Sequence, residues 1–172
     1  MNRNQQNREL RRWLSQHRGL LLKVVRSFAT ARSDQDDLFQ EIAIRLWESI
    51  PNHRDGIAET TWTYRVALYA AINWSKKEKR IRHRNQTLDG AEHLLIRPEE
   101  PPDPRLDWLY EQISRLDEID RSLTLLLLDG LSYREMSETL GISVSNVGVK
   151  INRIKKHLSG ISANDPSTAG KR

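Results

Sequence analysis

Hydrophobic residues recur every three or four positions along most of the chain, and alternating runs of β-branched residues are absent. Such spacing is typical of amphipathic helices, because positions i, i+3, i+4 and i+7 share one helix face. We therefore predict an all-α protein. The expected helices cover residues 5–31, a segment from Ser33 or Asp34 to about Ser49, 59–84, 105–116, a segment from Asp117 or Asp120 to Leu128, and two helices within 132–158.

Residues 86–105 interrupt this helical pattern. Four of the six prolines lie between residues 97 and 104, and a proline inside a helix removes a backbone donor and clashes with the preceding turn. Five acidic residues against two basic ones make the segment acidic. We predict two small helical domains, 1–85 and 105–160, joined by a flexible linker at 86–104 and followed by a disordered tail at 161–172.

The segment 132–158 has the pattern of two helices joined by a tight turn. Gly141 permits the positive φ with which helices often end, and Ser143 can cap the second helix by accepting a backbone hydrogen bond. The apolar side of the second helix holds Val147, Ile151, Ile154 and Leu158. Its other side has no acid and holds Ser145, Asn146, Lys150, Arg153 and Lys156. This arrangement is typical of a DNA-binding helix-turn-helix, although a helical hairpin with a merely solvated basic face has the same pattern.

The helix predicted at 59–84 ends in a basic segment, because residues 73–84 hold six cations and one acid. The helix macrodipole explains two or three cations at a C-terminus, but not six. We therefore predict contacts with nucleic-acid phosphates, for which Lys76, Lys77 and Arg80 are the best candidates.

Aromatic and amide side chains of the same helix are candidates for stacking on unpaired bases or for recognising them. They are Trp62, Tyr64, Asn73 and Trp74. Tryptophans at helical spacing more often belong to a core. We assign Trp74 to the core and leave Trp62 open between the two roles.

Four carboxylates gather near the start of the second predicted helix: Asp34, Asp36, Asp37 and Glu41. They could in principle hold a divalent metal, but the macrodipole favours acids at a helix N-terminus without any metal. Together with Gln40 and Arg45 they could equally form a protein-docking surface. The five histidines are scattered, and no nucleophile–base pair or glycine-rich phosphate loop occurs. We rank docking and capping above catalysis, and predict no metal site, no cofactor and no enzymatic activity.

The net charge of +5 is concentrated in the first half of the chain. Residues 1–85 hold 17 Lys+Arg against 9 Asp+Glu, which gives this block an electrostatic reason to approach a polyanion. The chain has no cysteine, its polar N-terminus lacks the apolar segment of a signal peptide, and no apolar run approaches the roughly 20 residues of a membrane helix. We expect a cytoplasmic protein that does not insert into membranes.

Taken in order, these motifs resemble a bacterial RNA polymerase sigma factor of the extracytoplasmic-function (ECF) subfamily. Asp34-Gln-Asp-Asp-Leu-Phe-Gln-Glu41, followed by Arg45-Leu-Trp47, resembles region 2.2 of that family. Trp62-Thr-Tyr-Arg-Val-Ala67 and the basic helix end resemble regions 2.3 and 2.4. The helix-turn-helix resembles region 4.2, and the likeness covers about residues 8–84 and 105–158.

The resemblance implies a σ2-like helical bundle and a σ4-like helix-turn-helix domain that act with core RNA polymerase and promoter DNA. It implies binding to the clamp helices of the polymerase β′ subunit by Asp37, Gln40, Glu41 and Arg45. It implies contacts with the −10 element by Trp62, Asn73, Lys76, Lys77 and Arg80. It implies contacts with the −35 element by Ser143, Ser145, Asn146, Lys150 and Arg153. The β flap is a further implied polymerase contact, and an anti-sigma factor is an implied candidate regulator.

Two departures from the family pattern fall in the last helix, one of which is Ile154, at a position where alanine is frequent. Gly148 stands where many members carry a cation, and a glycine inside a helix costs about 1 kcal/mol relative to alanine. The main alternative function is a stand-alone helix-turn-helix regulator whose N-terminal half serves as a dimerisation or sensor domain. The basic N-terminal half lacks a ligand-site signature and carries the docking motif, which favours the sigma-factor hypothesis.

Overall fold

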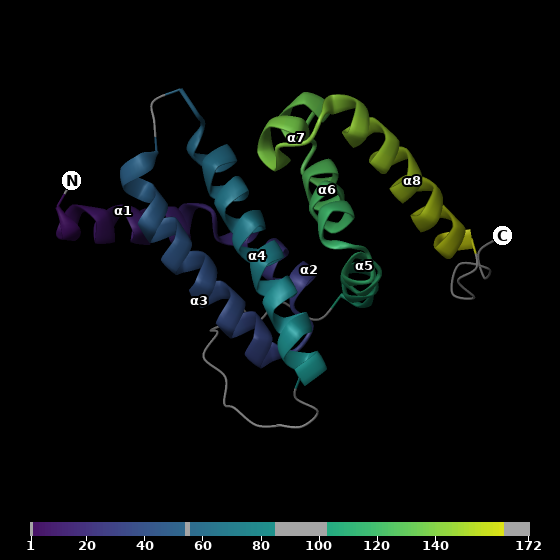
Figure 1. Ribbon diagram of the computed structural model, residues 1–172, viewed down its shortest axis with the longest axis horizontal. Helices are drawn as coiled ribbons and strands as arrows, with labels where there is room; N and C mark the ends of the chain where they lie inside the picture. Colours follow the sequence, from purple (N-terminus) through teal and green to yellow (C-terminus); the bar gives the residue numbers. More distant parts are fainter. Residues whose placement is uncertain (1, 54–55, 85–102, 164–172) are drawn as a thin grey trace. The chain divides into compact units, whose positions relative to one another are not determined.

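The computed structural model describes residues 2–53, 56–84 and 103–163 (Figure 1). In these ranges the chain forms helices and no strand, which confirms the predicted all-α fold. The elements are α1 (Arg3–Gln16), α2 (Arg18–Phe28), α3 (Arg32–Ser49), the 3₁₀ turn η1 (Ile50–Asn52), α4 (Glu59–Arg84), α5 (Pro104–Ser114), α6 (Glu118–Leu128), α7 (Tyr133–Leu140) and α8 (Val144–Ala163). None of these helices combines the length and the apolar character that crossing a bilayer requires.

The chain divides into two compact units, residues 1–114 and 115–172. This boundary falls later than the sequence suggested, because α5 packs on α2 within the first unit. Arg26 of α2 forms an ion pair with Asp107 at 3.0 Å and lies over the ring of Tyr110 at 4.4 Å. Most of the predicted linker at 86–104 and of the predicted tail at 161–172 lies outside the described residues, and α8 extends to Ala163.

In the first unit α3 and α4 lie side by side and α2 packs against both (Figure 1). Their contact surfaces are apolar because each helix repeats aliphatic residues at helical spacing. The fully buried side chains here include Leu21, Leu38, Ile42, Leu46 and Leu68. Burial of such residues, at about 1.5–3 kcal/mol each, is the main source of the unit's stability.

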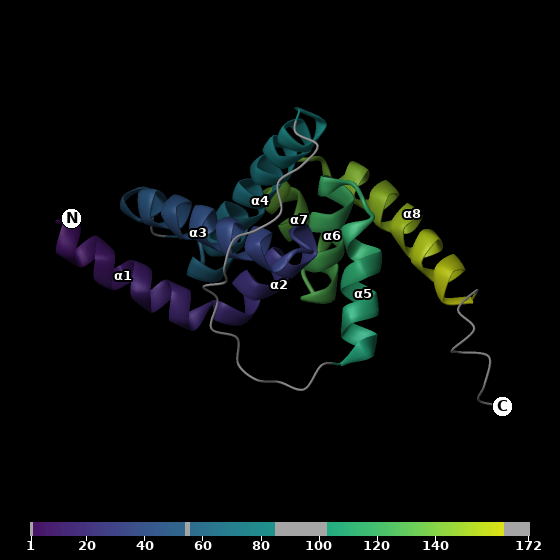
Figure 2. The ribbon, with the colours of Figure 1, turned by 90° about the horizontal axis from the view of Figure 1, so that it is seen from below.

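The helix predicted at 5–31 is in fact two helices that meet at His17 (Figure 2). At His17 the backbone leaves helical geometry, with φ −105° and ψ 17°. The imidazole is buried, and its Nε2 lies 3.0 Å from Oε1 of Glu59 at the start of α4. At the break His17 thus contacts a residue 42 positions away in the sequence. Helical periodicity alone could not predict this contact or the break.

The start of α3 also differs from the prediction. Neither Ser33 nor Asp34 is the N-cap; the helix begins at Arg32, and Ala31 occupies the cap position without a side-chain hydrogen bond. Asp34 lies in the first turn, where its carboxylate still interacts favourably with the helix dipole. The acids at this end therefore stabilise the N-terminus of the helix through their charge and not by capping it.

The second unit packs α6, α7 and α8 together. The predicted turn of the helix-turn-helix is confirmed, since Gly141 ends α7 with φ 68°. At the start of α7, Ser132 forms a capping box with Glu135. Ser143 caps α8, since its Oγ accepts the Asn146 N–H at 3.1 Å. Val147, Ile151 and Ile154 are buried as predicted, whereas Leu158 is half-buried. The apolar side of α8 therefore faces the unit, while Ser145, Asn146 and Lys156 of its polar side are exposed.

Candidate functional site

The four predicted docking residues lie together on one side of α3. Asp37, Gln40 and Arg45 are exposed and Glu41 is half-buried. Arg45 is held in place by ion pairs with Glu41 at 2.9 Å and Glu48 at 3.2 Å. We call the surface formed by residues 37, 40, 41, 44, 45 and 48 the α3 face.

Ile44 belongs to the α3 face, although the sequence analysis did not single it out. Its side chain is 53% exposed, and it follows Asp37, Gln40 and Glu41 by seven, four and three residues. These spacings place it on the same side of the helix. This spacing is visible in the sequence, but only charged and polar residues of the helix were predicted to form a docking surface.

The clustered acids of α3 do not converge on one point. Asp36 is buried, whereas its neighbour Asp37 is exposed. Over residues 2–53, 56–84 and 103–163, no three His, Cys, Asp or Glu side chains are close enough to share a metal ion. The α3 face therefore offers a surface with charges of both signs and an apolar residue among them.

The predicted phosphate-binding residues share one side of α4. Asn73, Lys76, Lys77 and Arg80 are all exposed, at spacings of three, four and seven residues from Asn73. Because such positions lie above one another on a helix, their donors form a continuous polar and cationic surface. We call this surface the α4 face.

Trp62 is not available to nucleic acid in the same way. Its Nε1 donates a hydrogen bond to Ser49 Oγ at 3.1 Å. Its ring meets His53 edge-on at 5.5 Å between centroids, and His53 meets Trp13 edge-on at 5.3 Å. Trp62 is half-buried in this stack, so the structure does not bring it together with the exposed residues of the α4 face.

The start of α4 is anchored by the carboxylate of Glu59. Arg12 lies 2.6 Å from its Oε2, and His17 Nε2 lies 3.0 Å from its Oε1. Burial alone would raise the pKa of Glu59, but hydrogen bonds from Arg12 and His17 outweigh burial and hold that pKa below its ordinary value. The ionised carboxylate therefore ties α4 to the junction of α1 and α2.

The predicted −35 residues of α8 fall into two groups. Ser143, Ser145 and Asn146 are exposed at its N-terminal end, with Ser143 engaged as the cap. Lys150 and Arg153 instead point toward α6.

Asp120 of α6 receives both of these cations. Its Oδ1 lies 2.7 Å from Lys150 Nζ, and its Oδ2 pairs with Arg153 Nη2. The Asp120 side chain is only 7% exposed and that of Lys150 22%, whereas Arg153 remains 62% exposed. Asp120 was predicted only as a helix start, because nothing local in the sequence links it to Lys150, thirty positions away. Of these two cations, Lys150 is therefore held by a partner within the protein, and Arg153 stays accessible to solvent.

Gly148 lies beside the ring of Tyr133, and a Cβ built at Gly148 would be 3.7 Å from Tyr133 Cε2. This distance is an ordinary van der Waals contact, so alanine fits without strain. We expect Gly148→Ala to raise the free energy of unfolding by about 0.5–1 kcal/mol, because alanine restricts the unfolded chain and favours helix. Chemical denaturation followed by circular dichroism would measure this. A decrease in stability would show that the Tyr133 ring cannot accept the methyl group.

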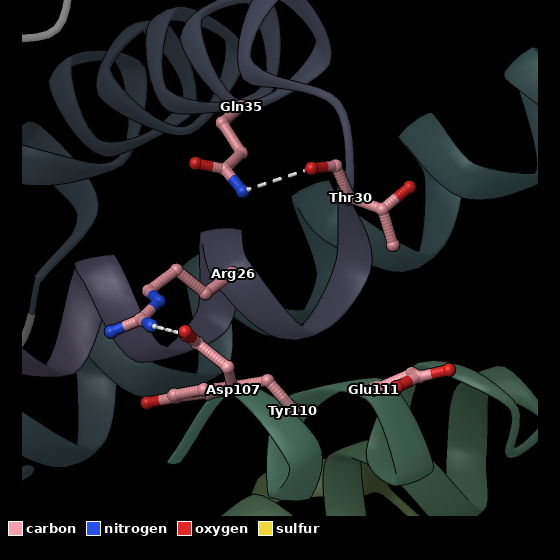
Figure 3. Close-up of a pocket in the computed structure, with 6 residues that line it drawn as sticks. All are labelled: Arg26, Thr30, Gln35, Asp107, Tyr110 and Glu111. Carbon is pink, nitrogen blue, oxygen red and sulfur yellow. Dashed lines mark hydrogen bonds and ion pairs between the residues drawn. The ribbon is translucent and has the colours of Figure 1, made fainter. Parts of the chain in front are cut away.

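A small cavity of 220 Å³ lies where α2, α3 and α5 meet (Figure 3). Its walls are formed by Arg26, Thr30, Gln35, Asp107, Tyr110 and Glu111. The lining groups engage one another: Arg26 pairs with Asp107 at 3.0 Å, and Gln35 Nε2 donates to the Thr30 carbonyl at 3.5 Å (Figure 3). The cavity thus lies at a helix junction held by its own polar contacts.

Two family models match the chain. The family model described as Sigma-70 region 2 matches residues 13–81, which include α3 and the α4 face. The model described as Sigma-70, region 4 matches residues 106–158, which include the helix-turn-helix. The molecule is therefore a two-region transcription initiation factor of the sigma class. The chain belongs to the sigma-70 family, in its ECF subfamily, and directs promoter-specific transcription with RNA polymerase.

Curated relatives carry the same subfamily name. The chain is 26% identical over 154 residues to the ECF RNA polymerase sigma-E factor of Haemophilus influenzae, covering 80% of this chain and 77% of the relative. It is 26% identical over 141 residues to the ECF RNA polymerase sigma factor SigX of Bacillus subtilis, covering 74% of this chain and 72% of SigX. The sequence-based assignment to this subfamily is confirmed.

Solved structures show the same fold. CnrH in complex with the cytosolic domain of CnrY superposes with a TM-score of 0.65 at 20% identity, over 92% of this chain and 91% of CnrH. The sigma factor RpoE of Bartonella quintana, in complex with the anti-sigma factor NepR, superposes with a TM-score of 0.68 at 17% identity, over 92% of this chain and 97% of RpoE.

Proposed function

We propose that the chain is a specificity subunit whose α3 face binds core RNA polymerase and whose α4 face and α8 bind promoter DNA. The observation that carries the proposal is the separation of these groups on the surface. The docking residues 37, 40, 41 and 45 share one side of α3, while residues 73, 76, 77 and 80 share one side of α4. Two neighbouring helices with different exposed chemistry suit two different partners.

On this proposal, the docking residues bind the clamp helices of the polymerase β′ subunit, as the family resemblance implies. The mixed charges of the α3 face set its specificity and orientation, and Ile44 supplies apolar area at its centre. The second unit would contact the β flap, again by family resemblance.

The DNA contacts are divided between the two units. Lys76, Lys77 and Arg80 neutralise phosphates near the −10 element, and Asn73 is placed beside them to contact bases. In α8 the exposed Ser145 and Asn146 stand at the N-terminal end, where a recognition helix meets base edges of the −35 element. Arg153, still accessible, is suited to a phosphate contact.

We also propose that the chain performs no catalysis itself and acts in the cytoplasm, where the polymerase supplies the chemistry. An anti-sigma factor is a candidate regulator, because the structurally similar RpoE of Bartonella quintana was solved in complex with the anti-sigma factor NepR.

The direct test adds the purified chain to sigma-free core polymerase and measures complex formation and transcription from genomic promoters. We expect a stable complex and initiation at a defined subset of promoters. Promoter binding without any affinity for core polymerase would instead support the stand-alone regulator.

The double variant Asp37→Ala, Glu41→Ala is expected to weaken binding to core polymerase about ten- to hundredfold, because it removes two carboxylates from the α3 face. Titration of labelled core polymerase measures the change. Glu9→Ala with Glu138→Ala removes the same number of acids from α1 and α7 and serves as the control. Unchanged binding by the α3 variant would remove the docking assignment from these residues.

A further inference from the structure

Helix α1 carries four arginines, one acid and no lysine. All four arginines precede residues 13–81, the segment that the Sigma-70 region 2 model matches. They belong to neither the α3 face nor the α4 face. The contacts of their side chains divide them into two pairs with different roles.

Two of the arginines serve the fold. Arg12 forms an ion pair with Glu59 of α4 at 2.6 Å. Arg3 lies over the ring of Trp47 of α3, 6.0 Å from its centroid. The charge of these two residues is therefore already used to hold α1 against its neighbours.

Arg8 and Arg11 have no such role. Both are exposed, and their guanidinium groups form no ion pair or hydrogen bond within the part of the chain that the structure describes. Asn4 and Ser15 lie on the same side of the helix, because the four positions are spaced by four, seven and eleven residues from Asn4. We call the surface formed by residues 4, 8, 11 and 15, all exposed, the α1 face.

Helix α1 is fixed to the rest of the first unit. Gln6 Nε2 donates to the Trp47 carbonyl at 2.6 Å, and Trp47 Nε1 donates to Asn7 Oδ1 at 2.8 Å. Asn2 and Gln5 form a capping box at the start of the helix. A helix of fourteen residues is marginal when isolated, so these contacts both stabilise α1 and hold its outer face in one orientation.

A solvated helix side is the simpler explanation for exposed arginines. Such a side usually mixes charges of both signs, because acid–base pairs three or four residues apart stabilise a helix. Arg8 and Arg11, three residues apart, instead place two like charges side by side with no acid between them on the α1 face. This arrangement costs helix stability, and a polyanionic ligand would offset the cost.

The chemistry of the α1 face favours DNA over a protein as that polyanion. Protein interfaces have an apolar centre, which Ile44 supplies on the α3 face, whereas residues 4, 8, 11 and 15 include no apolar side chain. Arginine, asparagine and serine are side chains that commonly contact DNA phosphates. The planar guanidinium group also matches the geometry of a phosphate better than an ammonium group does.

The α1 face lies apart from the basic end of α4. Arg12 joins α1 to Glu59 at the start of α4, and Lys76 follows Glu59 by seventeen residues, which is about 26 Å along the helix. We infer that Arg8 and Arg11 bind phosphates of promoter DNA outside the segment that the α4 face holds. This inference rests on the proposed function of the α4 face, and adds a second DNA contact that does not depend on base sequence.

The test uses the complex of the full chain with core polymerase and a promoter fragment. Phosphates of the fragment are replaced one at a time by uncharged methylphosphonates, and the dissociation constant is measured for each. Replacing a phosphate that Arg8 or Arg11 holds should weaken binding about three- to tenfold at physiological salt.

Three double variants then locate the cations that are responsible. Arg8→Gln with Arg11→Gln preserves helix propensity and should become insensitive to those replacements, while the log–log slope of affinity against salt becomes shallower by about 1.8. Arg8→Lys with Arg11→Lys keeps both charges and should retain the sensitivity and the slope. Arg32→Gln with Arg105→Gln removes two exposed arginines from α3 and α5 and should leave the phosphate profile unchanged.

A phosphate profile that is the same for the glutamine variant and the original complex overturns the inference. If that variant also binds core polymerase more weakly in the absence of DNA, the α1 face is a protein contact. Sensitive positions that coincide with those silenced by Lys76→Gln with Lys77→Gln would overturn it as well. If the double glutamine variant does not fold, the two single variants decide, since each should silence the phosphate that its arginine holds. Failure of the unaltered chain to bind core polymerase would refute the proposed function instead.

Discussion

Replacing Asp120 by asparagine is expected to lower the free energy of unfolding of the second unit by about 2 kcal/mol. Removing one partner of a buried ion pair costs about 3–5 kcal/mol, and the value here is smaller because Arg153 can turn to water. Lys150, 22% exposed, loses its partner 2.7 Å away and cannot be fully solvated in place. Denaturation monitored by circular dichroism measures the loss.

The effect of Asp120 should depend on pH. Burial alone would raise its pKa, but hydrogen bonds from Lys150 and Arg153 outweigh burial and leave the pKa below its ordinary value. The carboxylate therefore stabilises the fold fully above the unfolded pKa of about 3.9, and this contribution is lost as the pH falls through the lower folded pKa.

Asp120→Asn should accordingly remove part of the acid-induced loss of stability. The matched control is Glu138→Gln, which breaks an exposed ion pair with Arg134 and should change stability by less than about 0.5 kcal/mol. Identical acid unfolding of the original protein and the Asp120 variant would contradict the assigned role.

Replacing Ile44 by alanine is expected to weaken binding to core polymerase about thirtyfold, or about 2 kcal/mol. Interface residues that contribute most are those at the centre of a patch, where surrounding polar groups exclude water. Ile44 is 53% exposed and is flanked by Gln40, Glu41 and Glu48. Titration of core polymerase with the variant provides the measurement.

The Ile44 substitution leaves the fold intact, because the side chain is already exposed and alanine is the better helix former. Ile81→Ala, at an isoleucine 40% exposed on α4, serves as the control for loss of exposed apolar area. Equal binding by the Ile44 and Ile81 variants would show that the α3 face contributes through its charges alone.

Much of the fold could be predicted because its determinants are local. The spacing of apolar residues defined α4 at 59–84, and the turn and capping signals at Gly141 and Ser143 marked the helix-turn-helix. The break at His17 could not be predicted, since the contact of its side chain is with Glu59, far along the chain. The start of α3 was misplaced because no capping side chain is used there.

The candidate surfaces show the same division. Helical spacing correctly grouped the polar residues of α3 and α4 on common sides of their helices. Their shared position is a fact of geometry, and their function remains a prediction. The engagement of Trp62 with Ser49, and of Lys150 with Asp120, depends on tertiary contacts and was invisible in the sequence. Ile44 was visible in the sequence, but only charged and polar residues of its helix were predicted to form a docking surface.

The pairing of Lys150 with Asp120 has a consequence for the ionic strength at which the protein works. Each phosphate that a cation neutralises releases counterions and steepens the fall of affinity with salt by about 0.9 in a log–log plot. Lys150 already pairs with a carboxylate inside the protein, so it does not neutralise a phosphate and releases no counterion from the DNA. Counting the cations of α8 therefore overestimates how steeply its affinity for DNA falls with salt concentration. Binding to the −35 element should persist at higher salt than the charge of the helix suggests.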